Sequence, residues 1–266
     1  MELIKSAARR SQVSDIVYIL LNMGFVLTVY LLARFFDPPS FAYAVVILSK
    51  WRTLAVRPRF WFANIQTNLV DLMFGLSIVT LIWQANGHGW LQVAASLVFG
   101  VWLLVIKPQS KRQFVILQAG LSQFVALASM LSFAYVFDSF FSVLSGFVIG
   151  YIAARHVLLG YEEEQTTLLS LGWGMIVAEL MWVAYHWTIV YHVVTNNNAV
   201  GVGSGNVAIP QMAVVIALLS YLSANAYDNY HRRKLTIRIM RRPIIFVIAV
   251  LIVLFEGEFA ALFHIL

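Results

Sequence analysis

The ionisable residues inside apolar segments are the residues of this sequence best placed to do chemistry. Glu179 stands near the middle of an apolar segment over 167–194, and His186 follows it by two helical turns on the same face. A charged side chain at the centre of a bilayer costs about 3 kcal/mol on insertion scales, so such residues are functional by default. With His192 near the outer end and Asp71 in another segment, they could form a polar centre that moves protons or cations. Alternatively, Glu179 is protonated or hydrogen-bonded and holds helices together.

Asp71 ends a polar stripe at the inner end of its segment. Asn64 and Asn68 precede it at helical spacing, so the three side chains share one helix face. The stripe could line an inner cavity, or Asp71 could pair with a cytoplasmic arginine such as Arg57 or Arg59. We favour the ion pair, because charges near the inner end have water and partners within reach.

A second acidic pair, Glu256 and Glu258, lies in the outer half of the last apolar segment. Residues at positions i and i+2 point to different faces of a helix, so these two do not form an acid–base dyad by themselves. The glycine between them could admit another backbone or end the helix near Phe255. If the chain acts on lipid, Glu256, Glu258 and His264 are the acid–base candidates near the outer leaflet.

Small residues recur every fourth position in the segment over 139–159. Ser142, Gly146, Gly150 and Ala154 make a face on which another helix can pack closely. The partner helix could belong to the same chain or to a second copy in a homodimer.

A basic segment over 228–242 is predicted to face the cytoplasm and to lie on anionic lipid headgroups. Its basic residues are Arg232, Arg233, Lys234, Arg238, Arg241 and Arg242. The alternative is that these residues pair with the acidic cluster at 162–164.

Several chemistries are excluded by residues that the sequence lacks. There is no cysteine, which removes thiol catalysis, Cys-ligated zinc and iron–sulfur clusters. There is no His-Glu-x-x-His helix and no phosphate-binding glycine loop. No lysine lies in mid-segment, so a retinal Schiff base has no anchor. We therefore expect no metal and no cofactor.

Composition then sets the class of protein that must position these residues. The chain has 266 residues, 61% hydrophobic and 11% charged, against roughly 25% charged in an average soluble domain. This balance predicts a single integral membrane domain over 1–266, with no room for a separate soluble domain. The net charge of +6 follows membrane topology, so nucleic acid is not an expected partner.

Hydropathy predicts an all-α, polytopic transmembrane helix bundle of about nine spans. They cover residues 16–36, 40–56, 64–84, 89–106, 113–136, 139–159, 167–194, 209–227 and 243–265. With the N-terminus cytoplasmic and the C-terminus external, every lysine and arginine except Arg34 falls at the inner side, as the positive-inside rule requires. The span over 40–56 is the least certain of the nine, because its clean apolar stretch is short. The loop over 195–209 is predicted to be flexible and external.

Three functional hypotheses remain open at this point. One is a small permease or ion- or proton-coupled carrier centred on Glu179 and His186. Another is a non-catalytic membrane scaffold or complex subunit with a partner membrane protein. An intramembrane enzyme acting on lipid is the least favoured. Strong positive-inside bias without a targeting presequence predicts the plasma membrane of a bacterium.

Overall fold

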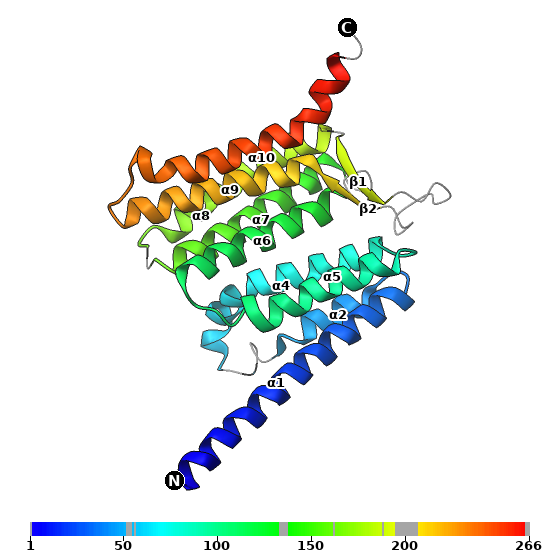
Figure 1. The fold of residues 1–266 in the computed structure, drawn as a ribbon, viewed down its shortest axis with the longest axis vertical. Helices are drawn as coiled ribbons and strands as arrows, with labels where there is room; N and C mark the ends of the chain where they lie inside the picture. The colour runs from blue at the N-terminus through cyan, green and yellow to red at the C-terminus, as the bar shows by residue number, and fades with distance from the viewer. Residues whose placement is uncertain are drawn as a thin grey trace. The chain divides into compact units, whose positions relative to one another are not determined.

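The computed structural model describes residues 2–51, 55, 57–132, 138–161, 163–187, 189–194 and 207–263. Within them the chain is almost entirely helical (Figure 1). It divides into two compact units. Unit 1 is Met1–Phe114 with Val193–Val207, and unit 2 is Val115–His192 with Ala208–Leu266. Each unit is described by itself.

Unit 1 is built from α1 (Glu2–Phe35), α2 (Ser40–Leu48), η1 (Pro58–Phe60), α4 (Trp61–Gln84), α5 (Gly89–Val101) and the π-helical turn η2 (Trp102–Ile106). Helix α1 packs against α2, α4 and α5, and α4 packs against α2 and α5. Its interior is apolar and aromatic, with Phe74, Phe99 and Trp102 almost fully buried. Helices α4 and α2 cross closely at Gly75, because a Cβ added there would overlap the side chain of Val46 in α2.

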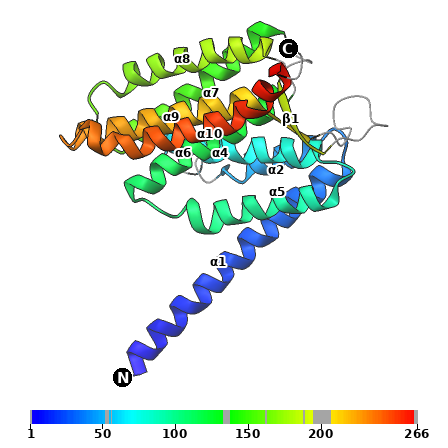
Figure 2. The same cartoon turned by 45° about the horizontal axis from the view of Figure 1, so that its top comes forward.

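Unit 2 contains α6 (Arg112–Leu131), α7 (Ser139–Leu159), α8 (Thr166–His186), α9 (Gln211–His231) and α10 (Ile237–Phe263). Helices α7 and α8 lie side by side, as do α9 and α10 (Figure 2). Helix α7 begins at Asp138, whose side chain accepts a hydrogen bond from the backbone N–H of Phe141 at 2.8 Å. This N-cap supplies one of the hydrogen-bond partners that the first turn of a helix lacks.

A two-stranded sheet corrects the boundary of the seventh predicted span. Strands β1 (Val190–Val194) and β2 (Val207–Pro210) pair with each other, so α8 ends at His186 and not near residue 194. The valine-rich run after Trp187 suits a strand better than a helix, since β-branched side chains have strained rotamers in helices. Part of the predicted loop over 195–209 is therefore strand β2, while residues 195–206 lie outside the described residues.

Among the described residues, six helices are long and apolar enough to cross a membrane, which supports a multi-pass membrane protein. They are Ser14–Phe35, Asn64–Gln84, Gly89–Ile106, Arg112–Leu131, Ser139–Leu159 and Thr166–His186. In the predicted span over 40–56, helix α2 is nine residues long, and residues 52–54 and 56 lie outside the described residues. At 1.5 Å per residue, α2 covers about 13 Å of the roughly 30 Å hydrocarbon core. The count of nine spans and the orientation of the termini stay predictions.

Candidate functional site

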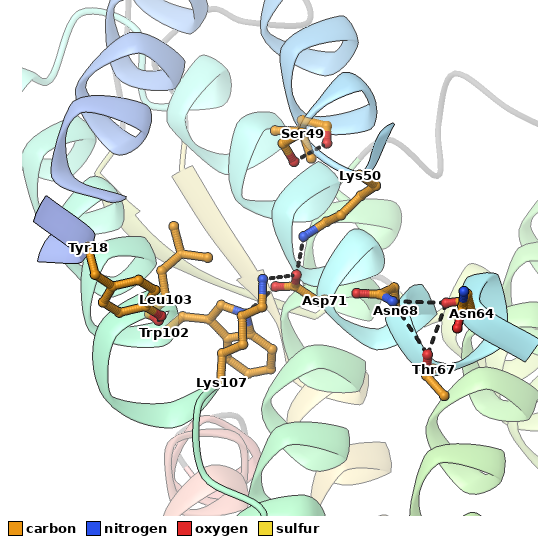
Figure 3. Close-up of polar contacts among 11 residues, drawn as sticks. Tyr18, Ser49, Lys50, Asn64, Thr67, Asn68, Asp71, Trp102, Leu103 and Lys107 are labelled. Atoms are coloured by element: carbon orange, nitrogen blue, oxygen red, sulfur yellow. Dashed lines mark hydrogen bonds and ion pairs between the residues drawn. The ribbon is translucent and has the colours of Figure 1, made fainter. Parts of the chain in front are cut away.

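A buried carboxylate joins three segments of unit 1. Asp71 lies in α4, and its Oδ2 is 2.6 Å from Nζ of Lys107, which follows η2. Lys50, just after α2, donates a hydrogen bond to the same oxygen. Figure 3 shows both lysine side chains converging on Asp71. The side chain of Asp71 is only 10% exposed, so the two ion pairs are shielded from solvent screening.

The second oxygen of Asp71 is occupied by Trp102. The indole Nε1 donates a hydrogen bond to Oδ1 at 2.8 Å, and the ring stacks on Phe74 at 3.9 Å between centroids. The backbone N–H of Lys107 bonds to the carbonyl of Trp102 at 2.8 Å, which is the i→i+5 spacing of a π turn. This wide turn brings Trp102 and Lys107 to the same carboxylate.

These contacts make Asp71 an anchor between helices. Both of its oxygens hold donors, so it has little capacity left to act as a general base. The side chain of Lys50 is 18% exposed and that of Lys107 is 39% exposed, so the cluster reaches the surface on the side of Lys107.

The expected ion pair at Asp71 is present, but its partners are lysines and not Arg57 or Arg59. Asp71 lies ten residues into α4, about 15 Å from the start of the helix, which puts it far from arginines that precede α4. Asn68 does not extend the cluster, because its amide donates to the carbonyl of Asn64 at 2.8 Å. The polar stripe is thus partly turned back onto its own helix (Figure 3).

In unit 2 the small residues of α7 meet α8 of the same chain. A Cβ added at Gly146 would lie 2.6 Å from Cβ of Met181, and one at Gly150 would lie 2.7 Å from Cβ of Val177. Ser142 is fully buried and Ala154 is half-buried. The sequence left open whether this face serves the chain itself or a homodimer. In the structure, Gly146 and Gly150 are covered from within the chain.

The opposite side of α8 is exposed, and we call it the Glu179 face. It comprises Leu168, Gly172, Met175, Glu179, Trp182 and His186, spaced three or four residues apart. The contact with α7 uses the other side of the helix, including Gly174, Val177 and Met181. Because α8 runs from Thr166 to His186, Glu179 lies about 10 Å from the end at His186 and about 5 Å from the helix midpoint.

Glu179 and His186 share this face, as their spacing predicted. Nδ1 of His186 is 2.9 Å from the carbonyl oxygen of Trp182, and the two rings are 4.7 Å apart. In the part of the chain that the structure describes, no hydrogen bond or ion pair reaches Glu179. Asp71 belongs to unit 1. His192 lies in β1, but its side chain is outside the described residues.

The outer acidic pair lies in a continuous helix. Helix α10 runs through Gly257 to Phe263, so the chain does not leave the helix near Phe255. The side chains of Glu256 and Glu258 and the whole of His264 lie outside the described residues. Their role as acid–base candidates stays a prediction.

A cluster of tyrosines and carboxylates at one end of unit 2 was not predicted. The hydroxyl of Tyr161 donates to Oδ1 of Asp228 at 2.7 Å, and Tyr227 donates to Glu163. Arg232 pairs with Asp228 at 2.9 Å. The i, i+4 spacing of Asp228 and Arg232 is a signal the sequence does contain. Glu163, from the acidic cluster at 162–164, therefore bonds to a tyrosine of α9. The sequence had left open that this cluster pairs with the basic segment over 228–242.

Among the described residues, no group of three or more His, Asp or Glu side chains is placed to hold a metal ion. The comparisons with protein-family models, curated proteins and solved structures give no match. Function therefore has to be inferred from the chemistry of the residues themselves.

Proposed function

We propose that this chain is a non-catalytic, multi-pass subunit of a membrane complex, and that the Glu179 face of α8 binds a transmembrane helix of a partner protein. The observation behind the proposal is that Glu179 lies inside an apolar span but on the exposed side of its helix. The other side of α8 is already packed against α7.

The energetic argument concerns an ionised carboxylate facing lipid. Such a group costs about 3 kcal/mol at the bilayer centre. Intramembrane charges almost always face a helix partner or a water-filled cavity. A partner helix on the Glu179 face would supply the hydrogen bond that the described residues do not.

The shape of the face suits another helix. Positions spaced alternately by three and four residues form the seam of left-handed helix pairs. At Gly172 an added Cβ would meet no atom within 4 Å, so a second backbone can come close there. Met175 and Trp182 flank Glu179 with large exposed apolar surface.

Charge complementarity indicates the chemistry of the partner. The lysines and arginines of the six candidate spans are Arg34, Arg112 and Arg155, and each lies within about one turn of a span end. A second copy of this chain would therefore set Glu179 against another carboxyl group. A helix with a lysine or arginine at the depth of Glu179 would instead form an ion pair, which we take to be the partner.

The test is cross-linking in the membranes of the cell that makes the protein. A photoreactive residue at position 175 or 182 should capture another membrane protein, and the mass of the adduct identifies it. Glu179→Leu should reduce the adduct by about tenfold, equivalent to about 1.4 kcal/mol. An adduct with a second copy of this chain would show that the Glu179 face forms a homodimer and does not bind another membrane protein.

A matched pair of glycine variants separates binding from folding. Gly172→Phe should block capture, because its ring would occupy the space of the partner. Gly24→Phe in α1 is the control, since Gly24 is also an exposed helical glycine with no atom near an added Cβ. If both variants capture the partner as efficiently as the parent chain does, the Glu179 face is not the interface. If the purified chain alone moves protons into vesicles and Glu179→Gln stops it, the carrier hypothesis replaces this proposal.

A further inference from the structure

The start of α10 carries a surface groove of about 480 Å³. It is lined by Arg238, Ile239, Arg241, Arg242 and Ile245. Three guanidinium groups therefore stand beside two branched apolar side chains in one hollow. Guanidinium groups bind phosphate oxygens in a bidentate manner, which makes this composition suited to a phosphate with an apolar tail.

Two carboxylates of unit 2 are engaged elsewhere. Asp228 is paired with Arg232, and Glu163 accepts a hydrogen bond from Tyr227. Across the described ranges, no ion pair involves Arg238, Arg241 or Arg242, and all three are exposed. Their charge is therefore available to an external anion.

An exposed apolar strip continues from the groove along α10. The helix packs on α9 with Met240 and Val247 buried, seven residues apart on one side. On the other side, Ile245, Ile248 and Ile252 follow Arg238 and Arg241 at the spacing of one helix face. Along this face the charged residues come first, and exposed apolar side chains follow for about two turns.

We propose that this groove is a binding site for an anionic phospholipid. The phosphate contacts Arg238, Arg241 and Arg242, and an acyl chain lies along the strip that begins at Ile245. A lipid fits better than a free phosphate ion because exposed Ile248 and Ile252 continue along the helix from Ile245 of the groove lining. The site is independent of the Glu179 face. It narrows the predicted headgroup-binding set to Arg238, Arg241 and Arg242, because Arg232 pairs with Asp228 and because Arg233 and Lys234 lie outside the groove lining.

The experiment measures lipid retention by the full-length chain purified in mild detergent. Native mass spectrometry counts bound phosphatidylglycerol and, in a parallel sample, bound phosphatidylcholine. The groove variant Arg238→Gln/Arg241→Gln should retain about tenfold less phosphatidylglycerol. The control variant Arg233→Gln/Lys234→Gln removes the same charge from the neighbouring loop, outside the groove lining, and should change retention less than about twofold.

Three results would overturn the site. Equal losses in the groove and control variants would mean that net charge alone attracts the lipid. Equal retention of phosphatidylcholine by the parent chain would mean that headgroup charge is not recognised. Displacement of phosphatidylglycerol by inorganic phosphate alone would mean that the apolar strip does not contribute to the affinity for the lipid. To establish that the groove variant folds, its helical circular dichroism and elution volume must match those of the control variant.

Discussion

Trp102 donates its indole N–H to Asp71 over 2.8 Å, from a π-helical turn that also delivers Lys107 to the same carboxylate. A regular α-helical turn rotates 100° per residue, so residues five apart would diverge on the helix surface. The π turn removes this divergence. The buried anchor of unit 1 thus depends on a local backbone irregularity as much as on charge.

Asp71→Asn should lower the free energy of unfolding by about 3 kcal/mol. The substitution leaves Lys50 and Lys107 in contact with a neutral amide, and breaking a buried pair by removing one partner leaves an uncompensated charge. The measurement is unfolding in mixed micelles followed by circular dichroism. Asp15→Asn, at an exposed position, is the control and should be neutral. Adding Lys50→Met to Asp71→Asn should recover part of the lost free energy of unfolding. A further loss would contradict the role of Asp71 as an anchor between helices.

Trp102→Phe should cost at least about 2 kcal/mol, the net value of a hydrogen bond to a charged group. A phenyl ring can still stack on Phe74, but it is smaller than the buried indole, so a cavity cost adds to the loss. In a double-mutant cycle, the variant with both Trp102→Phe and Asp71→Asn should lose less stability than the two single losses added together. Trp90→Phe is the control, because Trp90 is 62% exposed. Simple additivity with Asp71→Asn would show that the hydrogen bond contributes nothing.

Gly146→Ala and Gly150→Ala should each destabilise unit 2 by about 2 kcal/mol, as overpacking of a tight contact does. The new methyl groups would lie closer than 3 Å to Met181 or Val177 of α8. Gly172→Ala on the opposite side of α8 should be neutral or stabilising, because alanine favours helix and nothing crowds it there. Thermal unfolding of the three variants compares them directly, and equal melting temperatures would refute the close contact between α7 and α8.

Tyr161→Phe should lower stability by about 2 kcal/mol by removing the hydroxyl that donates to Asp228. Tyr161 is buried, so water does not readily replace the lost donor. Tyr230→Phe is the matched control, since Tyr230 lies on the same helix as Asp228 and is 67% exposed. Urea titration of both variants in micelles measures the difference. A similar midpoint for both would assign no role to the Tyr161 hydroxyl.

The membrane class and most helix positions could be predicted because they depend on local composition. A run of about twenty apolar residues signals a span wherever its neighbours lie. The same criterion overestimated the length of the helix in the segment over 167–194, where a strand follows α8. Hydropathy does not distinguish a helix from a shorter helix followed by a strand of equal apolarity.

The sequence by itself determined that this is a multi-pass membrane protein with ionisable residues inside its spans, because hydropathy and charge are properties of each segment alone. Only the tertiary structure decided that Asp71 pairs with Lys50 and Lys107, that Gly146 and Gly150 meet α8, and that Glu179 faces outward. A transmembrane helix is apolar on every side, so its periodicity does not reveal which side a neighbour covers. Partners are set by distances between segments, and those distances exist only in the folded chain.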